Sequence, residues 1–123
     1  MAGYSGTPLK QKLGIKDGDR VLVLGAPDSY AFATVTQGPA DVVHVFVKTL
    51  AELDKQLPEA RKAMTADGMI WVSWYKKAAK IPTDVTEDLI RARALATDLV
   101  DVKVCAVDER WSGLKLVIRK ALR

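Results

Sequence analysis

The chain has 123 residues, and 19 basic against 15 acidic side chains give it a formal net charge of +4 at pH 7. Hydrophobic residues make up 49% of it, and no apolar run approaches the ~20 residues that cross a bilayer, which excludes a membrane-spanning helix. The basic excess is too small to indicate a nucleic-acid-binding protein. Because the first residues also lack a secretory signal, we expect one cytoplasmic globular domain over 1–123, with no membrane contact.

The N-terminal segment predicts a short helix followed by a buried strand. Thr7 and Pro8 are typical of a helix start, and Gly14 is typical of a helix end. Residues 21–24 are apolar in succession rather than alternately, which is typical of a parallel strand covered on both faces.

The loop after this strand has one glycine where a nucleotide-binding loop has more. Gly25 is followed by Ala26, Pro27 and Asp28. A second glycine lets the backbone approach a dinucleotide or adenosyl ligand without a Cβ in the way, and Pro27 also lacks a backbone donor. We therefore expect no cofactor.

Residues 42–47 and 69–74 are two further apolar runs that predict strands of the same kind. His44, the only histidine, lies inside the first run, where we expect a neutral core residue rather than a catalytic base. Three buried parallel strands predict a sheet with helices on both faces.

Between these two strands the sequence predicts a helix with a marked start. Thr49 and Glu52 have the spacing of a capping box. Pro58 is expected to break or kink this helix, which then resumes and ends at Asp67 and Gly68.

A last helix is expected to begin at Thr83 or Asp84. Asp84, Glu87 and Asp88 favour the positive end of its dipole, so we interpret them as part of a helix start and expect no metal. Its buried stripe is predicted to comprise Val85, Leu89, Ala92, Ala96 and Leu99.

The end of the chain predicts an antiparallel pair. A strand over 102–107 is followed by a polar turn over 108–113 and a returning strand over 114–119. Cys105, the only cysteine, lies in the first of these strands, and we expect a buried, inert thiol. The whole pattern predicts an α/β protein with a mostly parallel sheet.

The order of these elements resembles the second half of a class I S-adenosylmethionine-dependent methyltransferase domain, which is Rossmann-like. Residues 21–25 resemble the first motif strand of that family, and residues 41–47 resemble its fourth strand. Residues 57–72 resemble the stretch that ends in a glycine turn before its fifth strand, and residues 102–118 resemble its C-terminal hairpin. The resemblance implies a three-layer α/β fold with that antiparallel hairpin.

A closer resemblance is to a small bacterial family known as a domain of unknown function. It is carried by the run from Gly68 to Val72, by Lys76 and Lys77, and by the run from Val107 to Val117. That family implies no activity for this chain.

The chain departs from the methyltransferase pattern between its first two strands. Only residues 26–41 lie there, so the second and third strands of the family are missing and the domain is truncated. In the family, an acidic residue at the end of the second strand holds the ribose hydroxyls of S-adenosylmethionine. Asp28 and Asp41 are the nearby carboxylates, but neither ends a recognisable strand.

Ligands of open α/β sheets bind beyond the carboxyl ends of the parallel strands. The residues expected there suit an anionic or aromatic small molecule, or a protein partner. The candidate ligand-binding residues are Gly25, Ala26, Asp28, Lys48, Trp74, Lys76, Lys77, Arg110 and Trp111. The alternative is that the tryptophans pack on the sheet and the lysines form a solvated rim. We expect Arg110 to pair with Asp108 or Glu109, rather than these carboxylates to act as acid and base.

We therefore predict a non-catalytic methyltransferase-like scaffold that binds a protein partner or an anionic small ligand at this edge. The alternative is a minimal S-adenosylmethionine-dependent methyltransferase completed by a second subunit. A nucleic-acid-binding module, whose affinity would fall strongly with salt, comes third. We also expect a homodimer, because the loss of two strands leaves the first strand near an unprotected edge.

Overall fold

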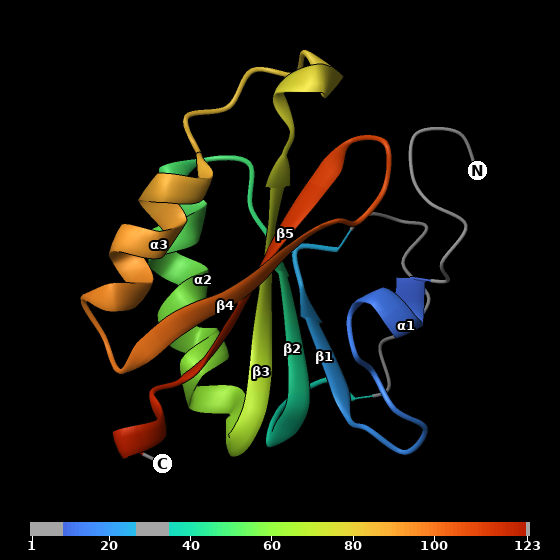
Figure 1. Cartoon of the computed structure of the whole chain (residues 1–123), viewed down its shortest axis with the longest axis vertical. Coiled ribbons are helices and arrows are strands. Elements are labelled where there is room, and N and C mark those ends of the chain that lie inside the picture. Colours follow the sequence, from blue (N-terminus) through green and yellow to red (C-terminus); the bar gives the residue numbers. More distant parts are fainter. Residues whose placement is uncertain (1–8, 27–34, 123) are drawn as a thin grey trace.

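Five strands form one sheet in the protein, for which a computed structural model describes residues 9–26 and 35–122. The strands are β1 (Val21–Leu24), β2 (Ala40–Phe46), β3 (Met64–Tyr75), β4 (Leu99–Ala106) and β5 (Trp111–Ile118), in the order β1-β2-β3-β5-β4 (Figure 1). β1, β2 and β3 pair in parallel, and β5 runs antiparallel to both β3 and β4. The predicted mostly parallel sheet with a C-terminal antiparallel hairpin is confirmed.

Helices cover both faces of this sheet, as predicted. α2 (Leu50–Ala63) and α3 (Glu87–Leu95) lie on one face, and the short α1 (Leu9–Lys12) lies on the other (Figure 1). Short 3-10 turns follow β3 at Lys77–Ala79 and end the described chain at Lys120–Leu122. None of the helices in the described ranges has the length and apolar character needed to cross a bilayer.

The two faces of the sheet bury separate parts of the core. On one face, Ile70 of β3 belongs to the same apolar cluster as Leu53 of α2 and Ile90 of α3. On the other face, the indole N–H of Trp71 donates to the carbonyl oxygen of Leu13 at 2.9 Å, just after α1. Because successive strand residues point to opposite faces, the neighbours Ile70 and Trp71 enter different cores.

The N-terminal elements agree with their predictions. α1 ends at Lys12, and Gly14 follows with a φ of 72°, the left-handed conformation that often ends a helix. β1 covers the predicted residues 21–24. The predicted helix start at Thr7 and Pro8 lies outside the described residues.

α2 does not break at Pro58, so the predicted break is wrong, as is the predicted helix end at Asp67 and Gly68. The helix continues through this residue, and β3 begins at Met64, which places Gly68 in a strand rather than at a helix end. Pro58 removes one backbone donor, whereas Leu53 and Leu57 bury apolar side chains against the sheet. The tertiary packing therefore outweighs the local preference of proline.

The start of α2 is stabilised by side chains from two segments. Thr49 and Glu52 form the predicted capping box. The N–H of Leu50 donates to Oδ1 of Asp84 at 2.8 Å, and the Thr83 hydroxyl donates to the backbone carbonyl just before the cap at 2.6 Å. Thr83 and Asp84 thus stabilise the start of α2 instead of beginning the helix that follows them.

α3 begins later than predicted, with Thr86 as its N-cap. Its buried residues are Ile90 and Ala94. The predicted stripe is wrong for Ala92 and Ala96, which are exposed, and for Leu99, which belongs to β4. Because an α-helix has 3.6 residues per turn, an error of a few residues in its start rotates the buried face around the helix.

The strands of the C-terminal hairpin are longer than predicted. β4 begins at Leu99 and β5 at Trp111, which shortens the turn. β1 lies at one edge of the sheet and β4 at the other, and no described strand lies beyond β1. The backbone N–H of Val35 donates to the carbonyl oxygen of Val21 at 3.2 Å, so residue 35 contacts the edge strand β1.

Candidate functional site

The carboxyl ends of β1, β2 and β3 lie at one edge of the sheet, and β4, which runs in the same direction, also ends there. Gly25 follows β1, Lys48 lies just beyond β2, and Lys76 follows β3. Arg110 lies in the turn from β4 to β5. These predicted site residues share one edge, which we call the carboxyl edge. The predicted Asp28 lies outside the described residues.

Packing accounts for the single glycine of the first loop. Gly25 has a φ of 73°, a left-handed conformation that side chains disfavour. A Cβ at this position would lie 2.6 Å from the carbonyl oxygen of Phe46. Gly25 therefore lets the chain turn against the end of β2, and the next residue, Ala26, is exposed.

The two predicted tryptophans lie on opposite faces of the sheet. Trp74 is 7% exposed in the core beneath α2 and α3. Trp111 is 5% exposed, stacks on Tyr75 with ring centroids 4.3 Å apart, and meets Phe46 edge to face at 5.0 Å. Since Trp111 is opposite Tyr75 and Trp74 is opposite Ser112, the strand alternation separates the indoles. We expected both tryptophans among the residues of one site at this edge. They lie instead on opposite faces of the sheet, so they do not share one surface.

The end of β3 is joined to the turn before β5. The backbone N–H of Lys76 donates to the carbonyl oxygen of Arg110 at 2.9 Å. Asp108 Oδ1 accepts from the backbone N–H groups of Arg110 and Trp111 at 2.7 and 2.9 Å, so this carboxylate shapes the turn. The expected salt bridge of Arg110 with Asp108 or Glu109 is absent from the described residues, and the Arg110 side chain is exposed.

A cavity of about 460 Å³ opens at the carboxyl edge, beyond β3 and beside the start of α3. Lys76 and Lys77 line it, and neither has an ion-pair partner among the described residues. Two carboxylates, of Glu87 and Asp88, also line it, and both form ion pairs with Arg91. The remaining lining residues are Trp74, Thr86 and Ser112. The cavity therefore combines two unpaired ammonium groups with two carboxylates that share one guanidinium, that of Arg91, which also pairs with Asp101.

Sequence reasoning missed Thr86 and Ser112 at this cavity. Ser112 lies opposite Trp74 in the β3–β5 register, which the sequence does not reveal. Sequence reasoning also missed a second cavity, of about 380 Å³, between α2 and α3. Leu53, Leu57 and Arg61 line this cavity and lie four residues apart along one face of α2. This spacing was the available signal, but the predicted break at Pro58 interrupted it.

His44 is a core residue, as predicted. It is buried, and its Nε2 lies 2.6 Å from Oγ of the buried Ser73. Its ring stacks on Phe46 with centroids 4.2 Å apart. Burial lowers the pKa of His44 from 6.5 to about 3, so the ring is neutral at physiological pH.

Cys105 is half-buried rather than fully buried as expected. Burial raises the pKa of its thiol, while Lys12 and Lys103 oppose that shift. The thiol is therefore protonated at neutral pH, consistent with an unreactive side chain. No cluster of three or more metal-ligating side chains occurs within residues 9–26 and 35–122.

The fold of this chain is similar to that of a protein whose structure was solved in complex with S-adenosylmethionine (SAM). No protein-family model and no curated protein matches the chain. The solved structure titled "The structure of LepI complex with SAM" matches with a TM-score of 0.50 and 14% identity over 90% of this chain and 39% of that one. Ribosomal protein L11 methylase from Lactobacillus delbrueckii subsp. bulgaricus matches with a TM-score of 0.48 and 14% identity over 68% and 38%.

The chain spans about two fifths of the length of either structure. At this identity the LepI match shows the fold alone: a methyltransferase-like α/β fold, as the sequence resemblance implied.

Proposed function

We propose that this chain is a non-catalytic, methyltransferase-like scaffold that binds an anionic small molecule in the cavity at the carboxyl edge. One observation carries the proposal: Lys76 and Lys77 line a cavity of about 460 Å³ and have no carboxylate partner in the described part of the chain. A phosphate or carboxylate group would accept hydrogen bonds from both ammonium groups and from the Ser112 hydroxyl. A concave site of this size favours a small molecule over a flat protein surface.

The non-catalytic part of the proposal is supported by what the acid–base candidates do. His44 is neutral and hydrogen-bonded to Ser73 within the core. Asp108 accepts two backbone hydrogen bonds that shape the turn before β5. Both side chains already have a structural role, so the proposal assigns neither of them a chemical step.

The test is a titration with pyrophosphate, followed by the backbone amide NMR shifts of the labelled protein at low and high salt. We expect saturable shifts at Lys76, Lys77 and Ser112. The variant Lys76→Ala/Lys77→Ala should lose at least about tenfold in affinity, because two charge-assisted hydrogen bonds are removed. The matched control Lys55→Ala/Lys103→Ala removes the same charge from two exposed lysines that do not line the cavity.

Equal losses of pyrophosphate affinity in the two double variants would overturn the proposal, because they would show that pyrophosphate is attracted by the net charge of the protein and not by a specific site. Shifts confined to other parts of the chain would do the same. Shifts that are unsaturable at millimolar pyrophosphate would also contradict it.

The second candidate function is SAM binding, supported by the likeness to the fold of LepI, whose structure holds SAM. The same NMR titration with SAM and S-adenosylhomocysteine tests it. Saturable shifts at Gly25, Ala26 and Lys48 would support this candidate and start a search for a methyl acceptor. The variant that should block SAM binding is Ala26→Trp, because Ala26 is exposed. A substitution at Gly25 is unsuitable, because its side chain would meet the Phe46 carbonyl.

A further inference from the structure

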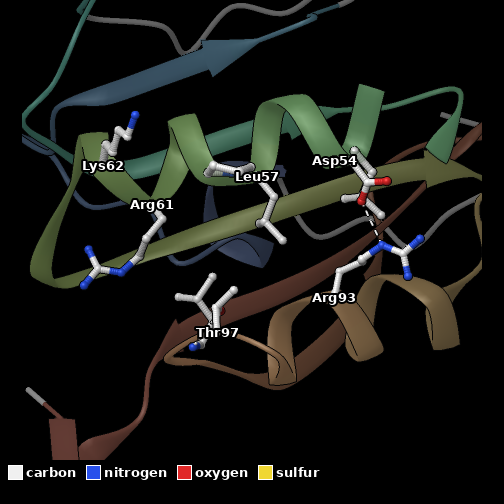
Figure 2. Close-up of a pocket in the computed structure, with 9 residues that line it drawn as sticks. Asp54, Leu57, Arg61, Lys62, Arg93 and Thr97 are labelled. Carbon is white, nitrogen blue, oxygen red and sulfur yellow. Dashed lines mark hydrogen bonds and ion pairs between the residues drawn. The ribbon is translucent and has the colours of Figure 1, made fainter. Parts of the chain in front are cut away.

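The cavity between α2 and α3 has mainly apolar walls. Leu53, Leu57 and Pro58 of α2 form one wall, and Leu99 and Thr97 lie opposite. Figure 2 shows Leu57 pointing from α2 into the space between the helices, toward Thr97. The volume of about 380 Å³ falls in the range of roughly 300–1,000 Å³ that small-molecule sites occupy.

Two ion pairs that involve lining residues connect α2 to the segment on the other side of this cavity. In one pair, Arg93 Nε of α3 donates to Oδ1 of Asp54 at 2.8 Å (Figure 2). In the other pair, Arg61 Nε and Nη2 bind the carboxylate of Asp98 at 2.7 to 3.1 Å. Both pairs therefore connect α2 to the opposite wall of the cavity.

The rim of the cavity has unused cationic donors. Arg93 uses only its Nε on Asp54, so both of its Nη groups have no partner among the described residues. Lys62, which also lines the cavity, is exposed and has no carboxylate partner there. The lining therefore carries three cations, Arg61, Lys62 and Arg93, and one carboxylate, Asp54, while Asp98 pairs with Arg61 from outside the lining.

From this arrangement we infer that the cavity between α2 and α3 is a second binding site, which takes a small amphipathic anion. The apolar body of the ligand, an aromatic or short aliphatic group, would lie against Leu53, Leu57 and Leu99. Its single carboxylate, sulfonate or sulfate would accept hydrogen bonds from the free Nη groups of Arg93. This site is separate from the carboxyl edge and does not depend on the function proposed for that edge.

The experiment compares two probes with the same apolar body. Anilinonaphthalene sulfonate carries one anionic group, and N-phenylnaphthylamine lacks it. Fluorescence titrations of the folded protein, whose tertiary structure is checked by near-ultraviolet circular dichroism, measure both affinities. We expect saturable binding of both probes, with the anionic one at least several-fold tighter.

Two variants distinguish the effect of the Arg93 charge from the effect of the Arg93–Asp54 ion pair. Arg93→Gln and Asp54→Asn both break the Arg93–Asp54 pair, but only the first removes the positive charge. The sulfonate probe should bind about tenfold more weakly to Arg93→Gln, through loss of a charge-assisted hydrogen bond, and equally or more tightly to Asp54→Asn. The neutral probe should bind both variants with the same affinity as the original chain.

A third variant fills the cavity. Pro58 is exposed on the α2 wall, so Pro58→Phe should place a ring in the cavity and weaken both probes. The inference is overturned if neither probe saturates, if Arg93→Gln and Asp54→Asn behave alike, or if Pro58→Phe binds normally. Lys76→Ala/Lys77→Ala should leave both affinities unchanged, which keeps this result independent of the carboxyl edge.

Discussion

The backbone N–H of Lys76 and the carbonyl oxygen of Arg110 are 2.9 Å apart, and this bond joins the end of β3 to the turn between β4 and β5. It holds two cationic residues from distant parts of the sequence at one edge of the sheet. The Asp108 carboxylate fixes the same turn by accepting from the N–H groups of Arg110 and Trp111. The backbone conformation at Arg110 therefore depends on Asp108.

The first prediction concerns this turn. Asp108→Ala removes the acceptor of two backbone N–H groups and should lower the free energy of unfolding by about 1–2 kcal/mol. Asp108→Asn keeps an acceptor oxygen and should cost less than half as much. Urea denaturation of the two variants provides the measurement, and equal losses would show that the charge rather than the acceptor matters.

The second prediction concerns the glycine after β1. Gly25→Ala must adopt a positive φ and also place its Cβ against the Phe46 carbonyl, whereas Gly18→Ala, at a φ of 89°, meets nothing within 4 Å. The strain of the left-handed backbone alone costs about 1–2 kcal/mol, so Gly18→Ala should lose that much free energy of unfolding. Gly25→Ala should lose clearly more, or fail to fold. Similar losses in denaturation of the two variants would refute the role given to the Phe46 contact.

The third prediction concerns the buried histidine. The pKa of His44 is about 3 in the folded chain and 6.5 as its ordinary value, so between these pH values the unfolded chain binds a proton that the native one does not. The contribution of the neutral His44 to the free energy of unfolding is complete above pH 6.5. Below pH 6.5 the free energy of unfolding should fall by about 1.4 kcal/mol per pH unit.

The control for this effect is His44→Asn, which cannot titrate. The difference in free energy of unfolding between the original chain and this variant should shrink as pH falls from 7 to 5. Because other titrating groups cancel in the difference, a constant value over that range would contradict the buried neutral histidine.

The fourth prediction follows from the proline within α2. Pro58 cannot donate a backbone hydrogen bond inside a continuous helix. Pro58→Ala restores the donor and removes the ~3 kcal/mol penalty of proline inside a helix. The substitution also makes the unfolded chain freer, which offsets part of that gain, so the free energy of unfolding should rise by about 1–2 kcal/mol. Glu59→Ala, at the exposed neighbouring position, should change it by less than about 0.5 kcal/mol. A destabilised Pro58→Ala chain would show that the proline is needed at this site.

The fifth prediction is the homodimer. β1 and β4 are the edge strands, and Val102 and Val104 of β4 are large apolar side chains that are 54% and 45% exposed. Such an edge favours pairing with another strand. Light scattering after size exclusion should give a dimer mass, and Val102→Lys should shift it toward the monomer if β4 is the edge used. A monomer at high concentration would exclude the dimer.

The fold was predictable because the strands have a strong local signal. Residues 21–24 and 42–46 are apolar in succession, and that pattern correctly predicted parallel strands covered on both faces. The helix boundaries were less predictable. Pro58 lies within a continuous helix, and Thr83 and Asp84 look like a helix cap but bind the start of α2. Neither arrangement has a local signature in the sequence.

The sequence by itself determined the sheet, the reversed final strand and the edge at which Lys48, Lys76 and Arg110 gather, because strand direction follows from the order of apolar runs and short connections. Only the tertiary structure decided which side chains share a surface. The register of β3 against β5 sends Trp74 and Trp111 to opposite faces and sets Ser112 opposite Trp74, beside the lysines. The packing of α2 against α3 likewise forms the second cavity. Register and helix packing depend on contacts between residues far apart in the chain, which no local pattern specifies.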